Sequence, residues 1–325
     1  MHAEPPRSAF RRRRGWGRSE RSIVMLVITG ASGHIGSQAA EILLDQGEQV
    51  RVIGRKSEGL QRLVKRGAEE MIGNLLDRAF LGRAFTGARA VFALIPPNYT
   101  AADFRAYQKV VGKNLANAIV DAGVGHVVNL SSQGAELPDG TGPILGLHDQ
   151  EARLNALSDV QVLHLRPTYF MENLLLNIPL IQQQGIAGSA VRGDVPFAMI
   201  ATRDIAEVVA ARLSRRDFAG KTVLDLLGPR DLTLTEATAV LGRRIGKPEL
   251  KYVQFSIEEA TRGMLAMGLS PDMVRLYLEM SQAISDRRFA AGRVRTPENT
   301  TPTTIEAFAE IFAAAYRDAT THKAA

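Results

Sequence analysis

Three glycines at short, regular spacing give the strongest chemical signal in the sequence. They lie in the segment Val27-Ile28-Thr29-Gly30-Ala31-Ser32-Gly33-His34-Ile35-Gly36, directly after an apolar run and before a helix-like stretch. In such a loop Gly30 permits a tight turn, Gly33 lets the backbone approach a pyrophosphate, and Gly36 lets the helix pack closely on the strand. The helix N-terminus then offers free N–H groups to phosphates. Because the loop also opens an alternating series of strands and helices, we interpret it as a dinucleotide-binding loop rather than a plain turn.

The tip of the second apolar run bears on which dinucleotide is bound. Sites that prefer NAD place an acidic residue there to bind the ribose 2′-hydroxyl. This chain instead has Arg55, Lys56 and Ser57 after Gly54. The planar guanidinium of Arg55 suits a 2′-phosphate, with Lys56 close by. We therefore expect NADP(H) to be preferred over NAD(H); a solvated basic turn is the alternative.

The residues of a conventional short-chain dehydrogenase site are missing. No Tyr-x-x-x-Lys occurs in the chain, and the stretch where it would fall reads Gly146-Leu147-His148-Asp149-Gln150-Glu151-Ala152-Arg153. Alcohol oxidation by that mechanism is therefore disfavoured. His148 is a candidate acid or hydrogen-bond donor, because an unperturbed imidazole titrates near neutrality; a structural role at a helix start is the alternative. The histidines show no metal-ligand spacing, so we expect no metal site.

These residues need a parallel α/β sheet to position them. Apolar strand-like runs alternate with amphipathic stretches from Met25 onward, which predicts a Rossmann-type doubly wound fold. The expected strands are Met25–Thr29, Gln49–Gly54, Glu69–Ile72, Ala88–Ile95, His126–Ser131 and Gln161–Arg166. The expected helices between them are Ile35–Gln46, Ser57–Arg66, Arg78–Phe85, Ala101–Ala122 and Asp149–Leu157.

Beyond Pro167 the pattern changes to that of a smaller α/β lobe on the substrate side. We expect helices at Tyr169–Gln184 with a break near Pro179, Thr202–Leu213, Thr235–Ile245, Ser256–Met267, Pro271–Ser285 and Thr304–Tyr316. A strand is expected at Lys221–Leu227 and a loop at Gly185–Gly193. The predicted organisation is a basic extension at 1–24, an NAD(P)-binding domain at 25–167, and a substrate lobe at 168–325. Some segments of that lobe are free to return to the main sheet.

Charge and composition narrow the classes of function. The 325 residues carry a net charge of +6, but residues 1–24 hold seven arginines and two glutamates, so the rest of the chain is nearly neutral. That argues against nucleic-acid binding by the folded part. We interpret the extension as disordered or as lying upstream of a natural start at Met25; a nucleic-acid-binding arm or a targeting segment is the alternative. There is no cysteine, and no apolar run has the length of a membrane helix. We expect a cytoplasmic protein that binds neither nucleic acid nor membrane.

A set of motifs in order along the chain resembles the NmrA-like branch of the atypical short-chain dehydrogenases. The motifs run from about Met25 to Tyr316: Thr29–Gly36, Gly54-Arg55, Gly73-Asn74-Leu75, Ile95-Pro96-Pro97, Leu130-Ser131-Ser132, Leu165-Arg166-Pro167-Thr168-Tyr169-Phe170-Met171-Glu172-Asn173 and Ala201-Thr202-Arg203-Asp204-Ile205-Ala206. The branch includes NADPH:quinone reductase-like and azoreductase-like enzymes and catalytically silent cofactor sensors.

The resemblance implies a position for each site residue. The cofactor-binding residues would be Gly30, Ser32, Gly33, His34, Ile35, Gly36, Arg55, Lys56, Asn74, Leu75, Ile95, Pro96, Pro97 and Ser131. Among these, Asn74 and Leu75 would lie by the adenine, although Asn74 stands where many relatives have aspartate. Ile95, Pro96 and Pro97 would border the nicotinamide-side ribose. Tyr169, Phe170 and Asn173 would line the substrate side, with ordinary core packing as the alternative for the two aromatic residues. The candidate catalytic residues are then His148 and Tyr169.

Two hypotheses of function follow. The first is an NADP(H)-dependent oxidoreductase that transfers a hydride to a quinone-like or other small conjugated acceptor. For such an acceptor the nicotinamide supplies the hydride, and the protein mainly orients the acceptor and excludes water. The second is a non-catalytic NADP(H)-sensing regulator of the NmrA type with a protein partner. An apolar cleft lined by Tyr99, Tyr169 and Phe170 would favour the enzyme, and a filled cleft the sensor.

Overall fold

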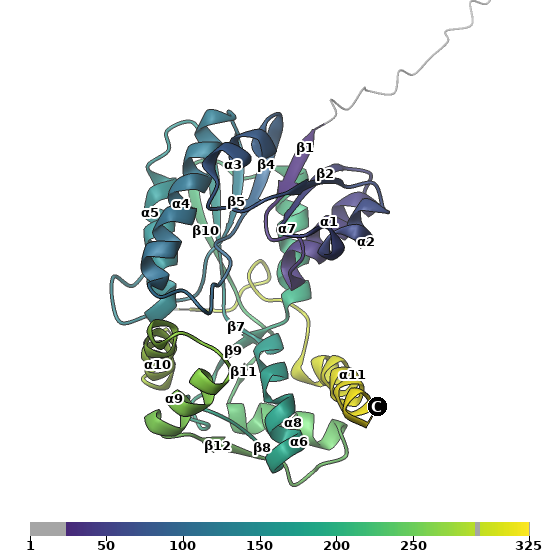
Figure 1. Ribbon diagram of the computed structural model, residues 1–325, viewed down its shortest axis with the longest axis vertical. Coiled ribbons are helices and arrows are strands. Elements are labelled where there is room, and N and C mark those ends of the chain that lie inside the picture. The colour runs from purple at the N-terminus through teal and green to yellow at the C-terminus, as the bar shows by residue number, and fades with distance from the viewer. Residues whose placement is uncertain (1–23, 290–292, 325) are drawn as a thin grey trace, which may run out of the picture.

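The computed structural model describes residues 24–289 and 293–324 of the chain. Nearly all of the basic extension at 1–24 therefore lies outside the described residues. Figure 1 shows a larger upper lobe built around a sheet and a smaller lower lobe, which contains α9, α10 and α11. Within the described ranges, no helix combines the length and apolar character needed to cross a membrane.

Seven parallel strands form the central sheet of the upper lobe. Their spatial order is β10 (Lys221–Leu226), β6 (Gln161–Pro167), β5 (His126–Leu130), β4 (Ala88–Ala93), β1 (Met25–Ile28), β2 (Gln49–Gly54) and β3 (Glu69–Ile72). The strand order reverses between β1 and β4, and ligands of doubly wound sheets bind at the carboxyl ends of the strands at that point. The predicted Rossmann-type fold is confirmed, and the expected strand at Lys221–Leu227 extends the main sheet by pairing with β6.

Apolar side chains on both faces of β1 explain why helices cover both faces of the sheet. Leu26 and Ile28 face one apolar cluster, whereas Val27 faces the other, and all three side chains are fully buried. The helices α1 (His34–Asp45), α2 (Gln61–Val64, after the 3-10 turn η1 at Ser57–Gly59) and α7 (Thr202–Arg215) cover the first face. The helices α3 (Arg78–Phe85), α4 (Phe104–Asp121) and α5 (Leu145–Asn155, after η2 at Gly142–Ile144) cover the second.

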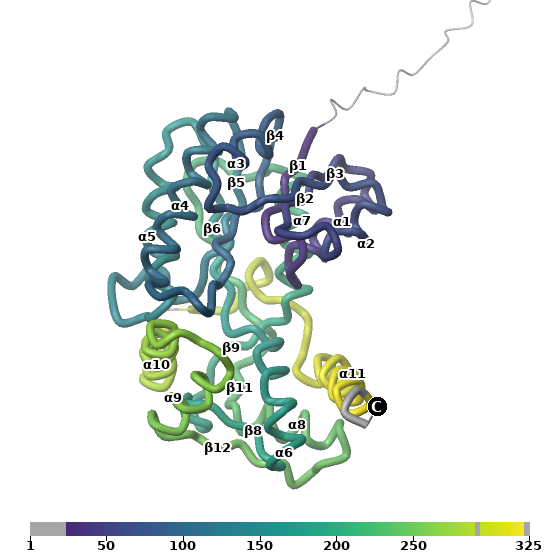
Figure 2. Tube along the Cα trace, in the orientation of Figure 1, coloured from purple at the N-terminus to yellow at the C-terminus, as the bar shows by residue number. Residues whose placement is uncertain are grey.

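The lower lobe is built from short strands and helices around its own apolar cluster. Its elements are β7 (Tyr169–Phe170), η3 (Met171–Asn177), α6 (Ile178–Gln184), β8 (Ile186–Ser189), β9 (Phe197–Ile200), β11 (Asp231–Leu232), α8 (Leu234–Arg244), β12 (Lys251–Gln254), α9 (Ile257–Ala266), α10 (Pro271–Ser285) and α11 (Ile305–Ala324). β7 and β11 flank β9, while β8 pairs with β12. The tube in Figure 2 shows the last helix, α11, returning beside α6 and α8, with which it is in contact.

Two expectations for this lobe are wrong. Tyr169 and Phe170 do not begin a helix, because they pair with Met199 and Ile200 of β9. The stretch Gly185–Gly193 is not wholly a loop, because Ile186–Ser189 forms β8.

The motifs that carried the family resemblance join the two lobes. The carboxylate of Glu172 accepts hydrogen bonds from the backbone N–H (3.0 Å) and the hydroxyl (2.6 Å) of Thr202, at the start of α7. Asp204, which is buried, accepts from the backbone N–H of Thr303 at 3.0 Å. These acidic residues therefore hold α7 between the central sheet and the lower lobe.

Candidate functional site

The glycine loop has the geometry that the sequence predicts. Gly30 lies at φ +63°, in the left-handed region that side-chain-bearing residues rarely adopt, and its carbonyl accepts the N–H of Gly33 at 3.0 Å. A Cβ on Gly36 would lie 2.9 Å from the carbonyl carbon of Gly30 and 3.1 Å from the Cα of Ala31, and closer still to the oxygen of Gly30. Any side chain at Gly36 would therefore push the helix away from the loop.

Hydrogen bonds anchor this loop at the junction of β1, β2 and β4. The hydroxyl of Thr29 donates to the carbonyl of Phe92 at 2.9 Å and accepts the N–H of Leu94 at 3.1 Å. The N–H of Ala31 donates to the carbonyl of Ile53 at 3.2 Å. Gly33 then precedes the first residue of α1 without any side-chain cap, which leaves the N–H groups of the first turn open to an anion.

The outer residues of the loop differ in what they offer a ligand. Ser32 and His34 are exposed, whereas the Ile35 side chain is buried in the core beneath the loop. Ile35 thus contributes backbone rather than side chain. The open N–H groups and the space kept by Gly36 fit the pyrophosphate of a nicotinamide nucleotide, which supplies a hydride for reduction when it is bound.

The tip of β2 places Arg55 near the opening of the site. Arg55 and Lys56 are exposed. Burial raises the pKa of Tyr107 on α4, and the positive charge of Arg55 opposes that rise. Sequence reasoning missed Glu70 of β3, which accepts a hydrogen bond from the hydroxyl of Ser57 at 2.9 Å. The tip of β2 therefore has a carboxylate beside its two cations.

The loop after β3 is held in place by its own polar groups. The side-chain oxygen of Asn74 accepts the N–H of Leu76 at 3.0 Å, which closes a local turn. Asn114 on α4 donates to the carbonyl of Leu75 at 3.2 Å and to that of Leu76 at 2.9 Å. The Leu75 side chain is buried. These bonds fix the loop at the carboxyl end of β3, and its contact with an adenine stays a prediction.

The loop after β4 is tied to the lower lobe. Ile95 and Pro96 are half-buried and Pro97 is exposed. Further along, Ser270 at the start of α10 donates its N–H to the carbonyl of Tyr99 at 2.8 Å. The carboxylate of Asp272 accepts the N–H of Phe104 at 2.9 Å. The lower lobe therefore fixes the loop that would border the nicotinamide-side ribose.

Ser131 does not face a ligand through its hydroxyl. It is buried and donates to the carboxylate of Glu151, which also accepts the Nε–H of Arg166 at 2.9 Å. Although burial opposes it, hydrogen bonds from Arg166 and Ser131 hold the pKa of Glu151 below its usual range. Glu151 is thus a permanent carboxylate near neutral pH. Sequence reasoning quoted Glu151 and Arg166 only within motifs and missed that they form this ion pair.

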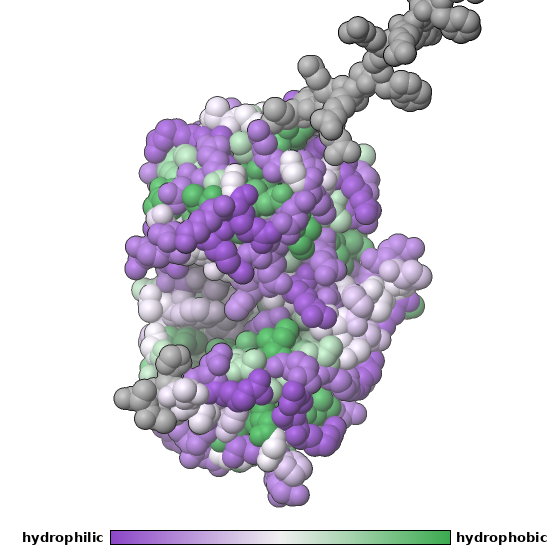
Figure 3. All heavy atoms as spheres, turned by 90° about the vertical axis from the view of Figure 1, so that its right-hand side faces the viewer, coloured by the Kyte–Doolittle hydropathy of each residue, from purple (hydrophilic) through white to green (hydrophobic). Residues whose placement is uncertain are grey.

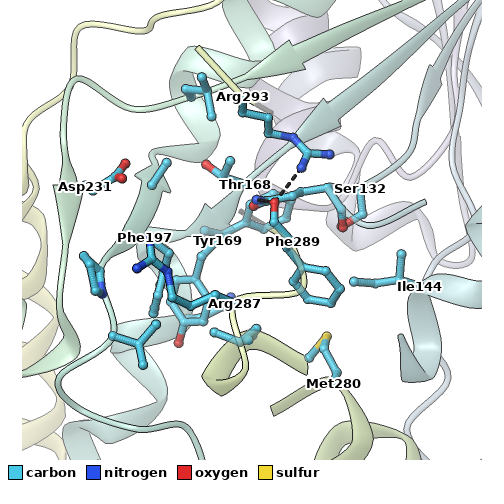
Figure 4. Close-up of a pocket in the computed structure, with 18 of the residues that line it drawn as sticks. Ser132, Ile144, Thr168, Tyr169, Phe197, Asp231, Met280, Arg287, Phe289 and Arg293 are labelled. Atoms are coloured by element: carbon cyan, nitrogen blue, oxygen red, sulfur yellow. Dashed lines mark hydrogen bonds between the residues drawn. The ribbon is translucent and has the colours of Figure 1, made fainter. Parts of the chain in front are cut away.

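A cavity of about 220 Å³ lies beyond the carboxyl ends of β5 and β6, between the two lobes. Figure 4 shows Tyr169 and Phe197 on one side of the cavity and Ser132 and Ile144 on the other, with Phe289 between them and Met280 below. On the face seen in Figure 3, a recess separates the upper and lower parts of the molecule, with apolar side chains below it. The lining residues are Ser132, Gln133, Ile144, Thr168, Tyr169, Phe170, Asn173, Val195, Pro196, Phe197, Ala198, Leu227, Asp231, Met280, Ile284, Arg287, Phe289, Arg293 and Arg295.

The structure brings some of the predicted substrate-side residues together and separates others. Tyr169, Phe170 and Asn173 all line the cavity, and the rings of Tyr169 and Phe197 are 5.3 Å apart. Tyr99 lies elsewhere, stacked on Tyr277 at 6.5 Å. Burial raises the pKa of Tyr169, so this residue stays a neutral phenol that can donate a hydrogen bond.

His148 lies outside the lining of the cavity. Its Nδ1 is 2.8 Å from the carbonyl oxygen of Ala135, so that nitrogen carries the proton and donates it to the backbone. This contact is the structural hydrogen bond that was the alternative for His148. Among the described residues, no histidine and carboxylate group has the arrangement of a metal site.

Comparison with known proteins agrees with this architecture. The NmrA-like family matches residues 24–309. A reductase of (4-alkanoyl-5-oxo-2,5-dihydrofuran-3-yl)methyl phosphate from Streptomyces griseus is 32% identical over 260 residues, covering 79% of this chain and 86% of the relative.

Two solved structures share the fold. An NADPH-dependent quinone oxidoreductase from Escherichia coli is 24% identical, with a TM-score of 0.68 over 88% of this chain and 99% of its own. The triphenylmethane reductase of Citrobacter sp., solved with NADP(H), is 19% identical, with a TM-score of 0.75 over the same shares of the two chains. The family match covers most of the chain, and the similar protein from Streptomyces griseus is a reductase. This chain belongs to the NmrA-like family and is an oxidoreductase.

Proposed function

We propose that this protein uses NADPH to reduce a small conjugated acceptor of the quinone type, without a Tyr-x-x-x-Lys pair. The observation that carries the proposal is the largely apolar cavity at the carboxyl ends of β5 and β6. It adjoins the sheet edge where the glycine loop would hold the dinucleotide. An open cavity at this place supports the enzyme rather than the sensor hypothesis, although Tyr99 is not part of it.

The reaction needs few groups from the protein. Reduction adds one hydride and one proton to the acceptor, and the proton comes from solvent or from a nearby donor. Phe170 and Phe197 would stack against a flat acceptor and exclude water, while the Tyr169 hydroxyl would donate a hydrogen bond to an acceptor oxygen. Because Tyr169 holds its proton firmly, its role is polarisation rather than proton exchange. His148 is not needed in this scheme.

The substrates of the similar proteins support a conjugated acceptor. The Streptomyces griseus enzyme reduces an acyl-substituted unsaturated lactone that carries a methyl phosphate, the Escherichia coli enzyme acts on quinones, and the Citrobacter enzyme on triphenylmethane compounds. These compounds share an electron-poor π system that accepts a hydride at carbon or oxygen. A cavity of about 220 Å³ is smaller than the roughly 300–1,000 Å³ of typical ligand pockets, which favours an acceptor of one or two rings.

The cofactor preference is part of the proposal. Arg55 would bind the 2′-phosphate of NADPH, with Lys56 adding positive charge at the same tip. Glu70 is held by Ser57 at 2.9 Å, which draws the carboxylate toward that hydroxyl. Arg55 itself is exposed and can turn toward a phosphate.

The test is cofactor binding followed by turnover, both with the full chain. NADPH and NADH are titrated by nucleotide fluorescence, and NADPH oxidation is then followed with a panel of quinones. We expect tighter binding of NADPH than of NADH and acceptor-dependent oxidation of NADPH. Tight binding with no turnover on any quinone would contradict the reductase and favour the sensor. Absence of binding by both nucleotides would contradict the interpretation of the glycine loop.

A further inference from the structure

The cavity contains one cation whose role nothing described so far explains. Three arginines from the segment after α10 line it, together with one carboxylate, that of Asp231. Arg295 pairs with Asp231 and also donates to the carbonyl of Gly228 at 2.9 Å. Arg293 pairs with Glu136 at 2.5 Å and with Asp225 at 3.2 Å. Two of the three arginines are therefore neutralised by the protein itself.

Arg287 differs from the other two arginines. Within residues 24–289 and 293–324, the guanidinium of Arg287 takes part in no ion pair or hydrogen bond, and the residue is exposed to solvent at the edge of the cavity. The adjacent carboxylate of Asp286 accepts instead from Gln282, at 2.9 Å. In Figure 4, Arg287 lies on the side of Tyr169 and Phe197, opposite Ser132.

The backbone at Arg287 is unusual for an arginine. α10 ends in a Schellman turn, in which the N–H of Arg287 donates to Ile284 at 3.0 Å and that of Arg288 donates to Ala283 at 2.9 Å. The residue at this place adopts φ +58°, a conformation for which helices mostly use glycine. Arg216 at the end of α7 is similarly left-handed, but its guanidinium caps its own helix by donating to Leu213 at 3.0 Å. Arg287 thus adopts a strained backbone conformation, and its side chain, unlike that of Arg216, does not cap the helix.

We propose that Arg287 is a specificity-determining residue that binds an anionic substituent, such as a carboxylate, sulfonate or phosphate, on the conjugated acceptor. The proposal rests on the proposed reductase function. The flat part of the acceptor would lie between Ser132 and Tyr169, and its anionic group would lie at the guanidinium. A guanidinium binds such oxyanions through two parallel hydrogen bonds, which fixes orientation as well as charge.

The test compares a neutral and an anionic acceptor of the same ring system. 1,2-Naphthoquinone and its 4-sulfonate are reduced by the wild type, by Arg287→Gly and by Arg287→Lys. We expect the wild type to favour the sulfonate in kcat/KM. Arg287→Gly should lose about tenfold on the sulfonate and change less than twofold on the neutral quinone. Arg287→Lys should retain part of the preference, because it keeps the charge but not the paired donors.

The glycine variant also separates binding from folding. Because glycine relieves the left-handed backbone, Arg287→Gly should melt no lower than the wild type. Arg216→Gly is the matched control: it relieves the same backbone conformation far from the cavity and should leave the acceptor preference unchanged. If Arg287→Gly kept the wild-type preference for the sulfonate, the proposed role of Arg287 would be wrong.

A redox-inert pair keeps the inference testable if the reductase proposal fails. Calorimetry with 1-naphthol and 1-naphthol-4-sulfonate, in the presence of NADPH, measures binding without turnover. Tighter binding of the sulfonate by the wild type, lost in Arg287→Gly, would support the anion site even if neither quinone were reduced. Equal binding of the two naphthols by the wild type would overturn it. Failure of the reductase proposal would show as absent quinone reduction, whereas failure of the Arg287 anion site would show as equal binding of the two naphthols.

Discussion

Replacing Gly36 with alanine tests the glycine loop at the point where the geometry leaves no room. The added Cβ would lie 2.9 Å from the carbonyl carbon of Gly30, where ordinary van der Waals contact begins at 3.4 Å. The backbone would have to open by at least about 0.5 Å, and no side chain can rotate to relieve the contact, since the atoms of Gly30 and Ala31 are backbone. The distortion would fall on the turn that the N–H of Gly33 closes at 3.0 Å.

The expected magnitude combines two opposing terms. Alanine in a helix gains about 1 kcal/mol over glycine, whereas forced overpacking costs about 1–3 kcal/mol. With backbone on both sides we expect the upper end, so Gly36→Ala should lose about 2 kcal/mol of unfolding free energy. At about 2–4 °C per kcal/mol, the melting temperature should fall by roughly 4–8 °C. The dissociation constant for NADPH should rise at least about tenfold, because the N–H groups no longer converge on the pyrophosphate.

Thermal denaturation and NADPH fluorescence titration measure the two effects. Gly82→Ala in α3 is the control, because a Cβ there meets no atom within 4 Å. This control should be as stable as the wild type or more so, with unchanged NADPH binding. A Gly36→Ala protein that melted and bound NADPH like the wild type would refute the argument from close packing. A lower melting temperature with unchanged binding would refute the role of the loop in holding phosphate.

Three further predictions follow from individual residues. Arg55→Ala should weaken NADPH binding about tenfold or more and NADH binding less than twofold, measured by titration, with Arg62→Ala as an exposed control; equal effects on both nucleotides would refute the 2′-phosphate contact. Tyr169→Phe should lower kcat for quinone reduction several-fold without changing NADPH affinity if the hydroxyl polarises the acceptor, whereas unchanged kcat would assign the ring to packing alone. His164 is buried between Asn129 and Asn155, and burial lowers its pKa from 6.5 to about 4. The unfolded chain therefore takes up this proton first, so stability should fall as the pH drops from about 6.5 to about 4, by at most about 3 kcal/mol. Urea unfolding at several pH values should show a shallower fall for His164→Gln, and an identical slope would contradict the assignment.

The sequence was most informative about the central sheet. The inner strands β1 and β4 are apolar on both faces, and each strand from β1 to β5 is followed by its own turn residues and helix, so these strands can be predicted locally. The bounds of β2 and β3 agree with the prediction to the residue. The glycine loop was equally predictable, because its function depends on backbone geometry that only glycine allows.

The lower lobe was harder to predict for a physical reason. β7 and β11 have two residues each, and β8, β9 and β12 have four, which is too short for a two-residue alternation to stand out. Their existence depends on partners far away in the sequence, as when Ile186 pairs with Lys251. The pocket arginines were missed for the same reason, because only the folded chain brings Arg287 and Tyr169 to one cavity.

The course of the chain between the lobes has a consequence for dissecting the protein. After entering the lower lobe at β7, the chain returns to the upper lobe for α7 and β10 and then descends again at β11. A fragment that began at residue 168 would carry α7 and β10 with no sheet to join. A fragment that ended at 167 would expose the edge of β6 and the face beneath α7. No single cut separates the lobes, so a graft of this substrate lobe onto another nucleotide-binding domain would have to replace several separate stretches of chain together.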